Sequence, residues 1–512
     1  MADAELAEQV EAAAEVPSFM RAEPLPDDLV IDDEGRVRLA TAPRLIERLV
    51  YPARFDDNGK FDHRLCAALL LTYRSFYSPH QLLQALLDVY DLEPPAELAQ
   101  LSAEEHSSWE AHWTWEAQRL LPVQLMICNV LQKWITNYLY DGDLGPELID
   151  GFRAFTDGPL ANNLKLAKFG TKLKSALEKK ASRARQSSRV HSARRHRPQV
   201  ELSFSVPPPQ LLFPPEGTFT MYDSPVTVEP LEWARQLTCL EFALFQQLQP
   251  KELLHLAWAK KDKEMRAPNV LALIHHFNTV SNWVASCVLA RAGLEERVDA
   301  YIHMVDLGYA CFELGNFNAM QEVAAGLELS AVHRLRRTKE ALPAKQLSKL
   351  ETLDSLCSTD ANRKAYRQAL SAATPPCIPY LGVYLTDLTF LDEGNPDRVK
   401  HRVGEGTGRD RELELINWRK HQSYAAIIED IRFYQQTHYN LARCEPLQSY
   451  LNEMMADTVL SVDEQYARSL EIEPRGQPSG AAAQAAASAR NGQTNKKRGS
   501  VGGVVQVVNG SI

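Results

Sequence analysis

The sequence predicts an all-α protein built from two helical domains, and two observations support this prediction. Apolar residues recur at helical spacing in both halves of the chain. Strands do not alternate with helices, so a doubly wound sheet is not expected. Hydrophobic residues make up 45% and charged residues 24% of the chain, and no apolar run reaches the ~18 to 20 residues of a membrane span. We therefore expect a soluble globular protein.

Proline, glycine and charged residues divide the 512 residues into five segments. Proline fixes φ and lacks an N–H, so a proline-rich stretch favours an extended linker. A segment rich in Gly, Ala, Ser and Gln buries too little apolar surface to offset the entropy of ordering. The expected segments are an acidic, disordered lead-in (1–39), a first helical domain (40–170), a basic and proline-rich linker (171–228), a larger helical domain (229–475) and a disordered tail (476–512).

The first domain carries explicit helix signals. Ser78 is an N-cap candidate, Pro79 suits the first helical position, and Gln81 completes a capping box. The apolar residues of 82–90 then fall on one helix face, and residues 125–139 repeat this spacing.

In the second domain, Pro230 opens a stretch whose apolar residues form one stripe over residues 231–248. Only the short run 378–385 has β-like character. No fixed period indicates a solenoid.

The eight cysteines lie far apart without a CxxC pair, so neither a disulfide framework nor a zinc cluster is predicted. The first 21 residues are acidic and alanine-rich, without the apolar core of a signal peptide. We expect a cytoplasmic protein with reduced thiols.

The formal charge of −10 hides a basic segment at residues 172–197, which holds ten lysines and arginines and a single acid, Glu178. Each basic residue near an anionic membrane adds about 1 kcal/mol, so this segment could recruit the protein to the plasma membrane. It lacks the interleaved aromatic residues of single-strand binders, so specific nucleic-acid binding is disfavoured. The plain alternative is a solvated linker.

Motifs for covalent chemistry are missing. The glycine-rich run 404–408 is not preceded by a strand or followed by Gly-Lys-Ser/Thr, which a phosphate loop requires. His275 and His276 are adjacent and diverge around a helix, so they predict no metal site. No nucleophile elbow or kinase motif set occurs, so nothing supports nucleophilic or phosphoryl-transfer catalysis, and we expect no cofactor. The chain is predicted to act by binding another molecule and not as an enzyme with covalent chemistry.

Several ordered motifs carry a family resemblance. Residues 62–90 and 122–155, the latter with VLQKWITNYLYDGD, resemble the Ras exchanger motif, or N-terminal RasGEF domain. The second domain resembles the catalytic domain of guanine nucleotide exchange factors for Ras-family GTPases. The stretches that carry the second resemblance are 231–254, 258–284, 316–338, 375–397, 416–420 and 470–475.

The resemblance implies an all-α catalytic domain that binds switch 2 of a small GTPase and inserts a protruding helical hairpin near its nucleotide. The hairpin would begin near Thr386, and the matching positions near magnesium and phosphate are Thr389 and Glu393, followed by Asn395. A spacing of four puts Thr389 and Glu393 on one helix face. The N-terminal domain would brace this hairpin.

A carboxylate in that place has a physical rationale, because a GTPase holds its nucleotide largely through phosphates and magnesium. Two unit charges 4 Å apart interact by about 4 kcal/mol at an effective dielectric near 20. Glu393 would therefore repel phosphate and accelerate nucleotide release.

The resemblance also implies a surface for switch 2 on the second domain. By position, the matching residues are Ile274, His275, Gln321, Glu328, His333 and Tyr380. The alternative is that Ile274 and Tyr380 belong to the core and that His333 is an internal histidine.

Three features depart from the family pattern. Thr389 stands where an apolar residue is common, Glu328 replaces an asparagine that faces switch 2, and the loop over residues 399–413 is extended. The leading hypothesis is an exchange factor for a Ras-, Rap- or Ral-type GTPase. The alternative is a GTPase-binding scaffold of the same fold without exchange activity.

Overall fold

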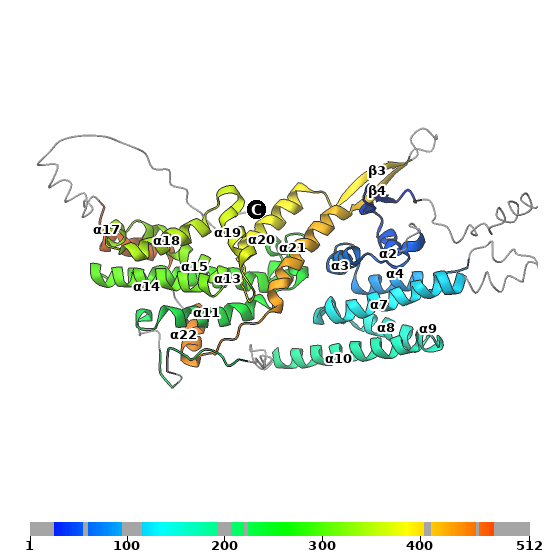
Figure 1. Cartoon of the computed structure of the whole chain (residues 1–512), viewed down its shortest axis with the longest axis horizontal. Coiled ribbons are helices and arrows are strands. Elements are labelled where there is room, and N and C mark those ends of the chain that lie inside the picture. Colours follow the sequence, from blue (N-terminus) through cyan, green and yellow to red (C-terminus); the bar gives the residue numbers. More distant parts are fainter. Residues whose placement is uncertain are drawn as a thin grey trace, which may run out of the picture. The chain divides into compact units, whose positions relative to one another are not determined.

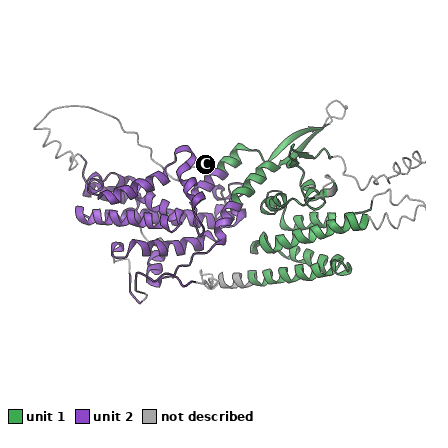
Figure 2. Ribbon diagram, in the orientation of Figure 1, with its two compact units in different colours: residues 1–201, 389–428 green, residues 202–388, 429–512 purple. Residues whose placement is uncertain are grey.

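The computed structural model describes residues 25–54, 60–94, 115–191, 206–214, 216–219, 224–403, 411–456 and 460–475. Most of these residues are helical, so the predicted fold class is confirmed (Figure 1). The chain forms two compact units (Figure 2). Unit 1 comprises residues 1–201 and 389–428, and unit 2 comprises residues 202–388 and 429–512.

Unit 1 contains a bundle of helices from the N-terminal part of the chain. A π-helical turn, Glu116–Leu120, leads into the longest apolar helix of this bundle. The helices are α2 (Ala42–Val50), α3 (His63–Thr72), α4 (Pro79–Tyr90), α7 (Leu121–Asn137), α8 (Pro146–Asp157), α9 (Pro159–Asn162) and α10 (Ala167–His191).

Helix α4 begins where the sequence predicts. The Ser78 hydroxyl accepts the backbone N–H of Gln81 at 3.2 Å, and the Gln81 side chain accepts the N–H of Ser78 at 2.8 Å. Behind α4, the fully buried rings of Tyr73, Trp134 and Phe152 form an aromatic core with centroid distances of 5.6 and 5.7 Å. These contacts explain why aromatic residues lie beside the leucine stripe of α7.

The predicted linker starts too early, because α10 runs through its first 21 residues. Leu173 and Leu177 are buried on the side that packs against α8, while most of the lysines face outward. A helix results because Leu166, Leu173 and Leu177 recur with the spacing of a buried helix face. The remaining basic residues from 192 to 197 lie outside the described residues.

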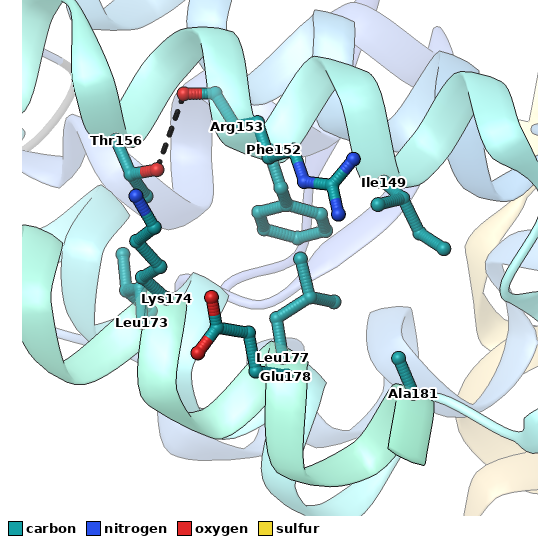
Figure 3. Close-up of a pocket in the computed structure, with 9 residues that line it drawn as sticks. All are labelled: Ile149, Phe152, Arg153, Thr156, Leu173, Lys174, Leu177, Glu178 and Ala181. Atoms are coloured by element: carbon teal, nitrogen blue, oxygen red, sulfur yellow. Dashed lines mark hydrogen bonds between the residues drawn. The ribbon is translucent and has the colours of Figure 1, made fainter.

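A small cavity lies between α8 and α10, and its volume of about 30 Å³ suits a single water rather than a ligand (Figure 3). Ile149, Phe152 and Leu177 supply much of its apolar lining. Near it, the hydroxyl of Thr156 donates to the Arg153 carbonyl at 3.2 Å. We interpret it as a gap in packing.

Unit 1 also contains an antiparallel sheet that the sequence did not predict. Its strand order is β1-β2-β4-β3. The strands are β1 (Leu29–Ile31), β2 (Val37–Ala40), β3 (Arg398–Val403) and β4 (Arg411–Asn417).

The sheet corrects two predictions. Residues 29–39 were assigned to a disordered lead-in, yet they form β1, β2 and their turn. The extended loop 399–413 forms most of the β3–β4 ladder, and its glycine-rich part, 404–410, lies outside the described residues. The run 378–385 is not a strand, because Ile378 makes only a single bridge to Asn316 before a helix begins at Leu381.

The helices of unit 2 form the larger bundle, and two more helices, α20 and α21, continue from it into unit 1. These two are α20 (Leu381–Gly394) and α21 (Trp418–Gln436). The others are α11 (Pro230–Phe245), α12 (Lys263–Arg266), α13 (Pro268–Leu289), α14 (Leu294–Glu313), α15 (Phe317–Glu328), α16 (Ser330–His333), α17 (Arg336–Glu340), α18 (Ala344–Cys357), α19 (Asp360–Ala372), α22 (Glu445–Ala456) and α23 (Val462–Ile472).

Close helix packing defines the core of unit 2. Trp283 donates its indole N–H to the Tyr450 hydroxyl at 3.0 Å, and Trp233 packs against both rings. Helices α13 and α15 approach closely at Gly326, where a Cβ would lie 2.5 Å from the Ser281 carbonyl oxygen. This position therefore requires glycine.

The C-terminal motif 470–475 closes the bundle. The Glu473 carboxylate accepts the Thr338 hydroxyl at 3.2 Å and lies 3.6 Å from the guanidinium of the buried Arg297. This network fixes α17 against the end of α23.

All eight cysteines are unpaired. Burial raises the pKa of the Cys66 thiol to about 11 and that of Cys287 to about 12, so both are poor nucleophiles. Among the described helices, none combines the length and the apolar character that crossing a bilayer requires.

Candidate functional site

The outer face of α20 presents Glu393, one of the predicted hairpin residues, to solvent. Glu393 and Thr386 are exposed, and Phe390 between them is 70% exposed. Leu388 is fully buried on the opposite side, and Thr389 is partly buried. The two predicted wedge residues thus share a helix but differ in access to solvent.

The turn after α20 is held by side-chain amides. Asn395 donates to the Leu391 carbonyl at 3.0 Å, which satisfies a carbonyl at the helix end. Asn417 at the end of β4 donates to the Pro396 carbonyl at 3.0 Å, and its backbone N–H donates to the Asp397 carbonyl at 2.9 Å. Asn395 therefore shapes the turn that follows Glu393.

Lys420 is the main anchor of this turn. Its side chain is 2% exposed, and Nζ lies 2.8 Å from an Asp392 carboxylate oxygen and 2.7 Å from an Asp397 carboxylate oxygen. Nζ also donates to the Asp392 carbonyl at 3.1 Å, while the Tyr424 hydroxyl donates to the Asp392 carboxylate at 2.6 Å. One buried ammonium thus joins residues on both sides of Glu393.

The N-terminal part of unit 1 braces this hairpin through the sheet and an aromatic stack. Strand β2 pairs with β4 at Leu39↔Asn417 and Ala40↔Ile416. The Phe76 ring meets His421 edge to face at 5.6 Å, and His421 stacks on the fully buried Trp418 at 5.6 Å. These contacts agree with the bracing role expected from the sequence.

The residues predicted to bind switch 2 lie in unit 2 and divide into two groups. In the first group, Ile274 is partly buried and His275 is exposed on α13. Tyr380 is only 6% exposed and packs on Phe277 at a ring distance of 5.4 Å. Its burial favours the alternative that Tyr380 is a core residue.

In the second group, Glu328 and His333 come together directly. The Glu328 carboxylate lies 2.9 Å from His333 Nδ1 and 3.4 Å from Lys339 Nζ. The His333 side chain is 62% exposed, so it is not an internal histidine. Gln321, on the same helix as Glu328, is 8% exposed, and its buried Oε1 has no hydrogen-bond partner among the described residues.

A buried cluster in unit 2 was not predicted. His276 Nε2 lies 3.2 Å from a Glu241 carboxylate oxygen and 3.9 Å from one of Glu322, and Asn318 donates to Glu322 at 2.8 Å. These ligand atoms are close enough to hold a metal ion. Burial and the neighbouring Glu241 carboxylate raise the pKa of Glu322 well above its ordinary value. We interpret the cluster as two carboxyl groups that share a proton.

The functional role of two residues was also missed. Lys420 and Asn417 lie in the recognised motif 416–420, but only the fold brings them to residues 392–397. No spacing rule could have shown this, because more than twenty residues separate the partners.

Two models of known protein families match this helical chain. Residues 232–422 match the model of the RasGEF domain, and residues 36–155 match that of the RasGEF N-terminal motif. The chain therefore belongs to the RasGEF family.

Relatives with curated names share both regions. The chain is 30% identical over 476 residues to protein son of sevenless of Drosophila melanogaster, covering 88% of this chain and 28% of that protein. It is 32% identical to Ras guanine nucleotide exchange factor I of Dictyostelium discoideum, covering 79% and 44%. It is 27% identical to cell division control protein 25 of Saccharomyces cerevisiae, covering 87% and 27%. The chain thus spans less than half the length of each of these relatives.

Proposed function

We propose that the protein is a guanine nucleotide exchange factor that accelerates GDP release from a Ras-family small GTPase. The observation that carries this proposal is Glu393, which is exposed at the end of α20 and flanked by the turn that Lys420 anchors. An exposed carboxylate on an anchored helix end suits the task because the GTPase retains its nucleotide through phosphates and magnesium.

The mechanism requires no covalent step. When the hairpin enters the nucleotide site, the Glu393 carboxylate repels phosphate and accepts hydrogen bonds from the emptied phosphate loop. About 4 kcal/mol for unit charges 4 Å apart corresponds to nearly a thousandfold in an equilibrium constant. Because coupling is reciprocal, bound nucleotide weakens exchanger binding by the same factor.

Switch 2 would bind the surface of α13, α15 and α16. Ile274, His275 and His333 offer accessible contacts there, whereas Gln321 is buried beneath them. Glu328 already pairs with His333 and Lys339, so a basic group of the GTPase would have to compete for its carboxylate. We propose that this acid contributes to the choice among Ras, Rap and Ral types.

The test is release of fluorescent GDP from purified GTPases of the Ras, Rap and Ral types. The whole chain should accelerate release from at least one, and Glu393→Ala should reduce that acceleration at least tenfold. Glu429→Ala, which alters an exposed glutamate on α21, is the matched control and should leave the rate unchanged.

The scaffold hypothesis predicts a different result in the same assay. Thr389 supplies little apolar bulk, which favours this second function. Tight binding to a nucleotide-free GTPase without faster release from any of the three types would establish it and refute exchange.

We further propose that the protein is cytoplasmic and meets anionic membranes through α10. Outward-facing lysines of this helix at 168, 172, 174 and 179 support this proposal. Cosedimentation with vesicles containing phosphatidylserine should be lost when these four lysines are replaced by glutamine. Equal sedimentation of both proteins would refute it.

A further inference from the structure

Phe390 is a large apolar side chain that the hairpin presents to solvent. It is 70% exposed, whereas Leu381, Val383, Tyr384 and Leu388 of the same helix are buried. Single exposed apolar residues are common on protein surfaces, so exposure alone assigns no role. The position of Phe390 on α20 carries the argument.

Phe390 lies on the same outer face as the proposed catalytic glutamate. Residues three and four apart are neighbours on a helix, so Phe390 adjoins both Thr386 and Glu393. All three are exposed. Thr389, by contrast, is partly buried and carries a hydroxyl. The face that Glu393 shares thus has its apolar bulk at Phe390 and not at the expected wedge position.

Helix α20, which carries this face, is held in place by its buried side. Leu388 is fully buried, and the main chain and side chain of Asp392 are tied to Lys420. A side chain on an anchored helix loses little backbone entropy on binding, so its contact area contributes efficiently to affinity. Aromatic residues are also well suited to interface centres because they bury a large area with few rotatable bonds.

We propose that Phe390 packs against apolar surface of the small GTPase beside its nucleotide site and supplies the hydrophobic part of the wedge that Thr389 lacks. This inference rests on the proposed exchange function. The occupant is the GTPase because any partner that receives Glu393 at its phosphate site must also cover the adjoining Phe390. Burial of a phenylalanine of this exposure corresponds to roughly tenfold to a hundredfold in affinity.

The test compares Phe390→Ser and Phe390→Leu with the wild-type chain. Affinity for nucleotide-free GTPase and the rate of labelled GDP release are both measured, and thermal melting verifies folding. Phe433→Ala is the matched control, because Phe433 is a 51% exposed phenylalanine on the neighbouring hairpin helix α21. We expect Phe390→Ser to lose at least tenfold in affinity and rate, Phe390→Leu to retain most of both, and Phe433→Ala to behave as wild type.

The outcomes separate this inference from the proposed function. If the wild type accelerates release and Phe390→Ser does so equally well, the role of Phe390 is refuted and exchange stands. If the wild type binds without accelerating release and Phe390→Ser loses binding, the contact is supported and exchange is refuted. Faster release by Phe390→Ser would contradict the contact, because removing a favourable contact with the GTPase cannot accelerate release. A wild type that neither binds nor accelerates overturns both.

Discussion

The ammonium group of Lys420 holds the turn that follows the hairpin helix α20. The Lys420 side chain is 2% exposed, and its ammonium group lies within hydrogen-bond distance of two carboxylates and one carbonyl. A buried charge is tolerated only when it is paired, so the lysine depends on its two aspartates, of which Asp392 is 18% and Asp397 57% exposed. Glu393 lies between these aspartates in sequence, and its position therefore depends on a residue 27 positions later.

Replacing Lys420 with methionine keeps much of the apolar stem and removes the charge. We expect the free energy of unfolding to fall by about 1 to 3 kcal/mol, because charge-assisted hydrogen bonds are lost and Asp392 remains partly buried without a cation. The rate of GDP release should fall as well, because the turn after Glu393 loosens. Urea unfolding and the exchange assay measure the two effects.

The control for this prediction is Lys400→Met. Lys400 forms an ion pair with Glu412 at 2.9 Å on the adjoining β-hairpin, but its side chain is 73% exposed. Exposed ion pairs contribute little to stability, so this variant should unfold and exchange as wild type does. Equal losses in the two variants would contradict the anchoring role of Lys420.

At the scale of elements, the pairing of β2 with β4 and the stack of Phe76 on His421 join early residues of the chain to the hairpin. The sequence predicted such a brace only through the family resemblance. It did not predict β1 and β2, because strands of three and four residues such as LVI and VRLA carry too little alternation to be recognised. Helix α4 was predictable because Ser78 and Gln81 signal its start locally.

Phe76→Ala tests the brace without deleting a domain. An edge-to-face aromatic pair contributes about 0.5 to 1.5 kcal/mol, so its loss should raise amide hydrogen exchange in β4 and the start of α21 by up to about tenfold. Phe61→Ala is the control, because the Phe61 ring contacts His63 two residues away at 4.9 Å. Unchanged protection of residues 411–424 in Phe76→Ala would show that the stack does not support the hairpin.

The buried cluster of α11, α13 and α15 yields a prediction about pH. Burial and Glu241 raise the pKa of Glu322, so the folded state keeps a proton that the unfolded state releases above its ordinary pKa of 4.5. A carboxyl of this kind stabilises the fold fully below pH 4.5. Its contribution is lost as the pH rises through the pKa that Glu322 has in the folded state. Between these limits the free energy of unfolding falls by about 1.4 kcal/mol per pH unit.

Glu322→Gln removes this titration and keeps the shape of the side chain. Urea unfolding at pH 5.5, 6.5 and 7.5 should show the wild type losing stability relative to Glu322→Gln as the pH rises. Glu328→Gln alters a 48% exposed glutamate of the same helix and should follow the wild type. Parallel pH profiles for wild type and Glu322→Gln would contradict the shared proton.

At the scale of the whole molecule, the compact units do not follow the linear order of the chain. The sequence predicted one domain over residues 229–475, whereas residues 389–428 belong to the unit formed by the N-terminal part. The family resemblance placed Glu393 on a helix, as the structure shows, because the motif around Gly394 and Asn395 is local. It could not locate the anchors at Lys420 and Phe76, since these depend on contacts between distant segments.

The most direct test of the central claim is the rate of labelled GDP release as a function of the concentration of the whole chain. The account predicts a rate that rises with concentration for at least one GTPase of the Ras, Rap or Ral type. The rate should be the same whether unlabelled GDP or GTP is the competitor, because the chain acts on release and not on the choice of nucleotide. A rate that stays at its spontaneous value at every concentration, with all three types, would contradict it.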